Sequence, residues 1–190
     1  MELSFSDRTI DLIEEGFDLV ICNGTLPDSS DLVARRLGEH QMMLCASPAY
    51  LFTHGEPKTV DDLKLHRAVG YMRFGKMLSW KFLIGDTVAE FIPTARILMD
   101  DLQAVLDACL AGLGVAWLPR WLVLDHLGFG KLETLMLDHT AVEFPINAVW
   151  PRTPHLLLKT RVAVDALLQK LPARLEGIEA CPQSELLPKV

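Results

Sequence analysis

The most regular hydrophobic pattern in the chain lies in residues 98–119, LMDDLQAVLDACLAGLGVAWLP. Its apolar side chains recur with the spacing of one helix face, at Leu102, Val105, Leu106, Cys109 and Leu113. We predict that Asp100 caps the N-terminus of this helix. Gln103, three residues later, would complete a capping box.

A buried strand is predicted to follow this helix. Gly112 suits the left-handed position beyond a helix end, and the apolar run 115–118, stopped by Pro119, is typical of a strand buried on both faces. With a strand at residues 95–98, this makes a right-handed crossover unit of a parallel sheet. Such units bind ligands at strand carboxyl ends, beside the next helix N-terminus. Residues 99–101 occupy that place, although the alternative role of Asp100 and Asp101 is to cap the helix and nothing more.

The remaining pattern predicts an alternation of strands and helices. Strands are expected at residues 2–5, 17–22, 41–46, 68–72, 80–84, 87–92, 131–137 and 144–150, with a separate polar-edged run at 32–37. The pair Gly85-Asp86 predicts a two-residue hairpin turn. Residues 23–30 form a turn-rich loop whose amides and hydroxyls suit a ligand, although most such loops are only connections.

Helix start and stop signals complete the outline. Helices are expected at residues 9–15, 48–54, 61–66, 120–126 and 155–171, with Pro48 at the first position of the second helix and Gly55 after its last. Ser6 or Asp7 would cap the first of these and Ser47 the second. The last helix would bury Leu157, Val164, Leu168 and Leu171, and a loose tail would follow Pro172.

Composition limits the class of protein. Half of the 190 residues are hydrophobic, which is enough for one core or two small lobes. The net charge of −7 argues against nucleic-acid binding by the chain itself. The four cysteines are far apart, which favours free thiols in a reducing compartment. With no signal-peptide pattern and no long apolar run, the chain is expected to be cytoplasmic and free of the membrane.

No pattern in the chain predicts catalysis. There is no GxSxG elbow, Walker loop or GxGxxG motif, and the six histidines are dispersed. His66, between a helix and a strand, is interpreted as structural. We therefore expect no catalytic residue, no metal site and no cofactor. A binding module needs none of these.

Three segments together resemble the C-terminal effector-binding domain of LysR-type transcriptional regulators. They are ELSFSDRTIDLIEEGFDLVI (2–21), SDLVARRLGEHQMMLCASPAYL (30–51) and DLQAVLDACLAGLGVAWLP (101–119). The last helix after AVWPRTP is also similar, so the resemblance runs from about residue 2 to 171. It implies an α/β fold like the type II periplasmic binding proteins, with two lobes joined by two crossing strands.

Carried onto this chain, the resemblance implies lobe one at residues 1–45 and 143–175, lobe two at 46–142, and a tail at 176–190. The crossings would fall near residues 44–47 and 143–148. A small effector would lie in the cleft between the lobes, lined by Asn23, Gly24, Thr25, Ser47, Pro48, Met99, Asp100, Asp101 and Leu102.

Two departures from the family pattern matter. The winged helix-turn-helix, the linker helix, and the first strand and helix of lobe one are missing, which predicts a fragment or a late start and leaves DNA binding to that missing part. Cys22 stands where the family usually has an arginine, which removes a cation from the cleft. We expect a neutral or weakly charged, partly apolar effector; the alternative is that Arg73 and Lys76 supply the positive charge, if their loop folds over the cleft.

The expected function is an effector-sensing and oligomerisation domain of a bacterial regulator, without catalysis. Family members pair side by side, so a homodimer or higher homo-oligomer is expected. The alternatives are a stand-alone small-molecule binding protein of the same fold and, with less support, an α/β transferase-like enzyme.

Overall fold

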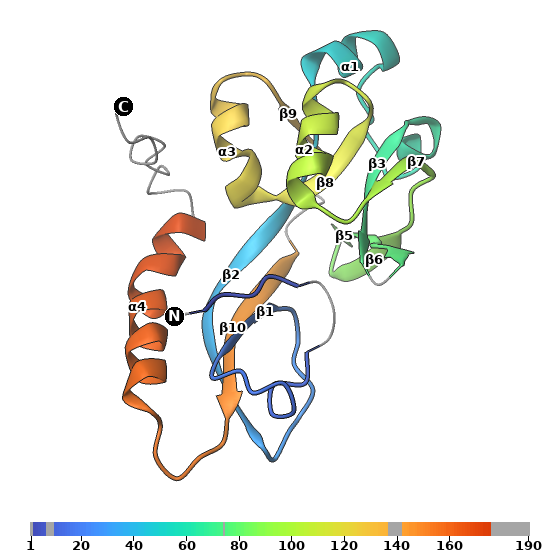
Figure 1. Cartoon of the computed structure of the whole chain (residues 1–190). Helices are drawn as coiled ribbons and strands as arrows, with labels where there is room; N and C mark the ends of the chain where they lie inside the picture. The colour runs from blue at the N-terminus through green and yellow to red at the C-terminus, as the bar shows by residue number, and fades with distance from the viewer. Residues whose placement is uncertain (1, 7–9, 74, 137–141, 176–190) are drawn as a thin grey trace, which may run out of the picture. The chain divides into compact units, whose positions relative to one another are not determined.

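The chain forms two compact units, described separately below. In the computed structural model (Figure 1), which describes residues 2–6, 10–73, 75–136 and 142–175, the larger unit comprises Met1–Ile10 and Gln41–Glu143. The smaller unit comprises Asp11–His40 and Phe144–Val190. No helix formed by the described residues is long and apolar enough to cross a membrane.

A sheet with a parallel centre forms the core of the larger unit. β3 (Ala68–Arg73) pairs in parallel with β7 (Ala95–Met99) along one edge and with β8 (Val115–Pro119) along the other. β8 in turn pairs antiparallel with β2 (Leu32–Ala46), which also pairs with β9 (Glu133–Leu135). The short β4 (Lys76–Met77) turns back on β3. The predicted parallel sheet is confirmed.

Helix α2 (Leu102–Leu110) connects β7 to β8 and confirms the predicted crossover unit. Its C-terminus is a Schellman motif: Gly112 N donates to Cys109 O (3.0 Å) and Leu113 N to Ala108 O (3.1 Å). Gly112 has φ +77°, as its position requires. Leu113 therefore lies beyond the helix and is exposed, whereas all five residues of β8 are buried.

The buried face of α2 packs on β2, β3 and β8 through an apolar cluster that includes Val69, Val105, Leu106, Ala116 and Leu118. Burial of each large side chain contributes roughly 1.5–3 kcal/mol.

Two thiols lie inside this cluster. Cys109 Sγ donates to Cys45 O (3.5 Å), and Cys45 Sγ to Ala116 O (3.7 Å). The hydrogen bond with Cys109 and burial raise the pKa of Cys45 well above its usual value. Both are free thiols, as predicted. Cys22 is half-buried and its Sγ lies 3.9 Å from Asn147 O, and Cys181 lies outside the described residues.

Helix α1 (Pro48–His54) begins and ends where predicted, at Ser47 and Gly55. Its one buried side chain, Tyr50, lies with its hydroxyl 3.2 Å from His66 Nδ1 and accepts a hydrogen bond from Arg67 N (2.9 Å). Burial raises the pKa of Tyr50 and lowers that of His66, so the two rings meet as neutral partners at pH 7. His66 has the structural role predicted for it.

Other short elements of the larger unit agree with prediction. The strands β5 (Trp80–Ile84) and β6 (Thr87–Phe91) form the hairpin around Gly85, which has φ +58°. The 3-10 helix η1 (Asp62–Leu65) and the helix α3 (Arg120–Gly128) lie at the expected places.

The smaller unit is built on antiparallel strands and one long helix. β1 (Val20–Asn23) pairs with β10 (Glu143–Pro151), which lies beside β2. Helix α4 (Leu158–Leu175) buries Val164 and Leu175 against Leu37, Ile146 and Ala148. Leu168 and Leu171 pack on the same cluster, as predicted.

The expectation for the N-terminal region was wrong. Residues 2–5 form no strand, because they have no neighbouring strand among the described residues to pair with. The described part of the predicted helix at 9–15 is a single turn: Asp11 Oδ1 accepts from Ile13 N and Glu14 N (3.0 Å each), and Gly16 at φ +72° ends it. Residues 7–9, including the proposed cap Asp7, lie outside the described residues.

Two further boundaries differ from prediction. β2 is one strand of 15 residues, because pairing with its neighbours overrides the weak strand preference of Gly38 and Glu39. α4 begins at Leu158 rather than at 155, which leaves Leu157 outside it and exposed. It continues past Pro172, where proline removes one backbone donor and the burial of Leu175 favours the last turn.

Replacing Gly114 with alanine is expected to lower the free energy of unfolding by about 1–3 kcal/mol, the usual cost of overpacking. A Cβ there would lie 2.5 Å from Arg67 O, which also accepts the hydrogen bond from Val115 N (2.8 Å). Urea unfolding measures the change. Gly128→Ala at the end of α3, where a Cβ meets open space, is the matched control and should cost nothing. Equal stability of the two variants would contradict the close approach.

Candidate functional site

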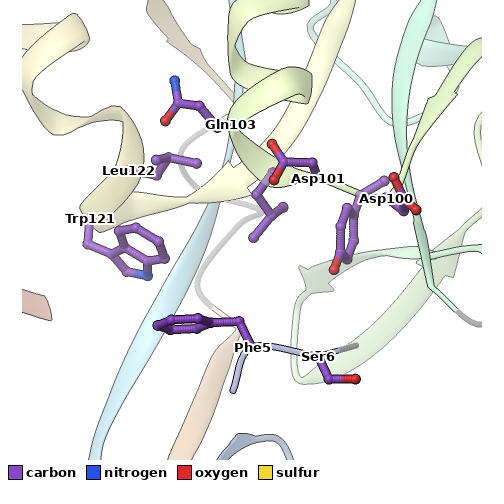
Figure 2. Close-up of a pocket in the computed structure, with 9 residues that line it drawn as sticks. Phe5, Ser6, Asp100, Asp101, Gln103, Trp121 and Leu122 are labelled. Atoms are coloured by element: carbon purple, nitrogen blue, oxygen red, sulfur yellow. The ribbon is translucent and has the colours of Figure 1, made fainter. Parts of the chain in front are cut away.

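A pocket of about 510 Å³ lies in the larger unit, within the size range of small-molecule sites. Figure 2 shows the residues that line it. They are Phe5, Ser6, Tyr71, Asp100, Asp101, Leu102, Gln103, Trp121 and Leu122.

The pocket lies where the three parallel strands end. Tyr71 is near the carboxyl end of β3, Asp100 directly follows β7, and Trp121 is the second residue of α3, which begins directly after β8. Parallel strands bring their carboxyl ends to one edge of a sheet. These three side chains, although distant in sequence, therefore line the same pocket.

Asp101, not Asp100, caps α2. Asp101 has extended backbone angles (φ −119°, ψ 124°), and its Oδ1 accepts from Ala104 N at 2.8 Å. The predicted cap at Asp100 and its capping box with Gln103 are therefore wrong: Gln103 Nε2 donates instead to Asp107 Oδ1 (3.0 Å). The physical reason is that the chain stays extended for one residue longer than the apolar pattern indicates.

The charge in the pocket is negative. Both aspartates are exposed, and the described lining residues include no basic side chain. Asp101 gives one oxygen to the helix cap. Asp100 takes no part in that cap and directly follows β7. Its carboxylate is therefore the more available of the two for contact with a ligand.

The apolar part of the pocket consists of two leucines and aromatic rings. Leu102 and Leu122 pack against the core cluster and line the base of the pocket. Tyr71 packs against the same cluster, whereas Trp121 remains 43% exposed. In the view of Figure 2, Trp121 and Phe5 lie to one side and the carboxylate of Asp100 to the other. The arrangement suits a flat, partly apolar molecule.

The structure brings together part of the predicted effector site. Asp100, Asp101 and Leu102 line the pocket, and Met99 is the half-buried last residue of β7. Ser47 lies elsewhere: it is 97% buried as the cap of α1, and a Cβ on Gly112 would lie 3.5 Å from its Oγ. That is the opposite end of α2, roughly 15 Å away at about 1.5 Å per residue.

Pro48 shares the place of Ser47, as the first residue of α1. Asn23, Gly24 and Thr25 belong to the smaller unit. There Gly24 N donates to Pro145 O (2.8 Å), and Asn147 Nδ2 donates to Gly24 O (3.0 Å), which fixes the loop after β1. A role for these residues in effector binding stays a prediction.

Sequence reasoning missed the other lining residues, Phe5, Ser6, Tyr71, Gln103, Trp121 and Leu122. A signal existed for one of them: the rule of strand carboxyl ends, applied to the run 115–119 as well as to 95–98, leads directly to Trp121. For a metal the described residues provide no group of three or more His, Cys, Asp or Glu side chains.

The family model of the LysR substrate binding domain matches residues 1–172. The chain belongs to the LysR substrate-binding domain family. This confirms the predicted resemblance and, with the solved structures below, the α/β fold of the periplasmic-binding-protein type.

Curated relatives of this LysR-type domain are transcriptional regulators. It is 32% identical over 84% of its length to an uncharacterised HTH-type transcriptional regulator of Haemophilus influenzae, of which it covers 55%. It is 31% identical over 93% of its length to the HTH-type transcriptional regulator CrgA of Neisseria meningitidis, of which it covers 59%. The chain thus spans little more than half the length of these relatives.

Solved regulators share the fold of this LysR-type domain. The regulatory domain of CrgA from Neisseria meningitidis matches with a TM-score of 0.75 and 29% identity, covering 87% of this chain and 81% of that one. The full-length Vibrio cholerae virulence activator AphB matches with a TM-score of 0.76 and 27% identity, covering 88% of this chain and 57% of that one.

Replacing Asp101 with alanine is expected to lower the free energy of unfolding by about 1 kcal/mol, because Ala104 N loses its capping partner. Asp100→Ala, the neighbouring control, should change it by no more than about 0.5 kcal/mol. Urea unfolding of the two variants gives the comparison. A larger loss in Asp100→Ala would show that the cap is assigned to the wrong residue.

Proposed function

We propose that this chain senses a small-molecule effector for a transcriptional regulator and performs no catalysis itself. The observation that carries the proposal is the pocket at the strand carboxyl ends, in a chain of the LysR substrate-binding family. We propose further that the two compact units are the two lobes of that fold and that the effector makes its contacts with the larger unit at Asp100, Leu102 and Trp121.

DNA contact belongs, in this proposal, to a helix-turn-helix segment outside the chain. The matched relatives are named as HTH-type regulators and are longer than this chain, and the chain itself carries a net charge of −7. A regulator of this kind acts on DNA in the cytoplasm. The alternative of a stand-alone binding protein shares the pocket but lacks the regulator's role.

Small metabolites that bind in the pocket are expected to raise the melting temperature of the 190-residue chain, by the equivalent of about 2.7 kcal/mol at 100 times the Kd. A thermal-shift screen finds them. Trp121→Ala should abolish the shift, because it removes a wall of the pocket. Phe129→Ala, an exposed ring at the other end of α3, should preserve it. A ligand that raises the melting temperature of both variants equally binds outside the pocket, and such a result would contradict the proposed site.

We also propose that the chain self-associates. On α4, Leu158 is 75% exposed and Val162, one turn later, is 59% exposed; Leu157 beside them is 55% exposed. Leu158 and Val162 are four residues apart and so share one face of the helix, and apolar side chains gathered on an exposed face are typical of an interface.

Sedimentation velocity at tens of micromolar is expected to show a dimer or a larger species. The double variant Leu158→Glu, Val162→Glu should shift it to the monomer, because each change places a charge in an apolar contact. Gln169→Glu, an added charge at an exposed polar position of α4, should leave the size unchanged. A strictly monomeric wild-type chain would refute self-association.

A further inference from the structure

The charges in the pocket favour one class of ligand. Two carboxylates, those of Asp100 and Asp101, belong to the lining, and none of the lining residues that the structure describes is basic. The N-terminus of α2 offers a positive partial charge of about one half, and the cap formed by Asp101 already uses part of it. The described part of the lining is therefore negative, and an anion entering the pocket meets repulsion from two carboxylates.

Among the residues that the structure describes, the basic side chains nearest in sequence to the lining are not part of it. Arg73 lies two residues after Tyr71, and Arg120 directly precedes Trp121, but neither lines the pocket. Lys76 pairs across the β3–β4 turn with Arg73 and is exposed. An acidic ligand therefore finds no basic partner in the described part of the lining.

The aromatic rings add attraction for positive charge. Tyr71 and Trp121 come from two different elements and meet at one pocket. The face of an aromatic ring attracts a cation, and tryptophan does so most strongly. A carboxylate near aromatic faces is the combination that binds ammonium groups on flat apolar molecules.

Resting on the proposed function, we infer that the effector of this site is an organic cation. Its ammonium group lies near Asp100, and its flat apolar body lies against Trp121 and Tyr71, above the leucine base of the pocket. The sequence alone indicated a neutral or weakly charged effector, because it revealed the lack of a cation but not the aromatic rings.

Three probes of similar shape test the charge: phenethylamine, 2-phenylethanol and phenylacetate. Their Kd values are measured on the 190-residue chain at pH 7 by ligand-observed NMR. We expect phenethylamine to bind at least tenfold tighter than 2-phenylethanol and phenylacetate to bind most weakly. Raising the salt concentration from about 50 to about 500 mM should weaken the binding of phenethylamine and leave the Kd of 2-phenylethanol unchanged.

Asp100→Asn should raise the Kd of phenethylamine about tenfold and leave the Kd of 2-phenylethanol unchanged. The variant keeps the cap of α2, which Asp101 forms, so the helix start is preserved. Asp125→Asn removes the same charge from an exposed position of α3 outside the lining and should change neither affinity.

Each other outcome contradicts the inference in a distinct way. The cation preference is overturned if phenylacetate or 2-phenylethanol binds as tightly as phenethylamine. If Trp121→Ala abolishes the binding of these probes in that case, the proposed function still stands. An amine preference that Asp100→Asn leaves intact overturns the role of Asp100. Failure of all three probes overturns the ammonium site, and the thermal-shift screen then decides separately whether the pocket binds other small molecules.

Discussion

The parallel pairing of β3 with both β7 and β8 is the constraint on which the candidate site depends. It brings three strand ends to one edge of the sheet, and the residues after or near those ends become neighbours. The pairing with β8 begins where Val115 N donates to Arg67 O, a place at which only Gly114 allows so close an approach. A contact of two backbones thus determines where Tyr71, Asp100 and Trp121 meet.

Helix α2 connects the core to the pocket, and its two ends have different roles. The C-terminal end is closed by the Schellman motif and lies against the start of α1, where Ser47 and Tyr50 are buried. The N-terminal end is open to solvent and carries the acidic pair. The buried end can hold the helix in place while the exposed end stays accessible for the ligand contacts proposed above.

Most of the fold was predictable wherever the signal is local. The caps of α1, the glycine turn of the β5–β6 hairpin and the run of β8 all depend on residues within a few positions of one another. Elements that depend on distant partners were predicted less well: residues 2–5 have strand-like alternation but no strand beside them. The same holds for the site, since Asp100–Leu102 followed from one crossover unit, whereas Tyr71 required knowledge of which strand lies next to β7.

The buried thiols of Cys45 and Cys109 give the larger unit a chemical reporter of its own motion. One sits on β2 and the other on α2, with no solvent access to either, and the raised pKa of Cys45 keeps its sulfur in the unreactive protonated form. An alkylating reagent reaches them only when α2 separates from the sheet. Their rate of modification therefore records how often α2 separates from the sheet. A molecule that binds at its N-terminus and stabilises the packed helix would slow the reaction at Cys109, about two helical turns away.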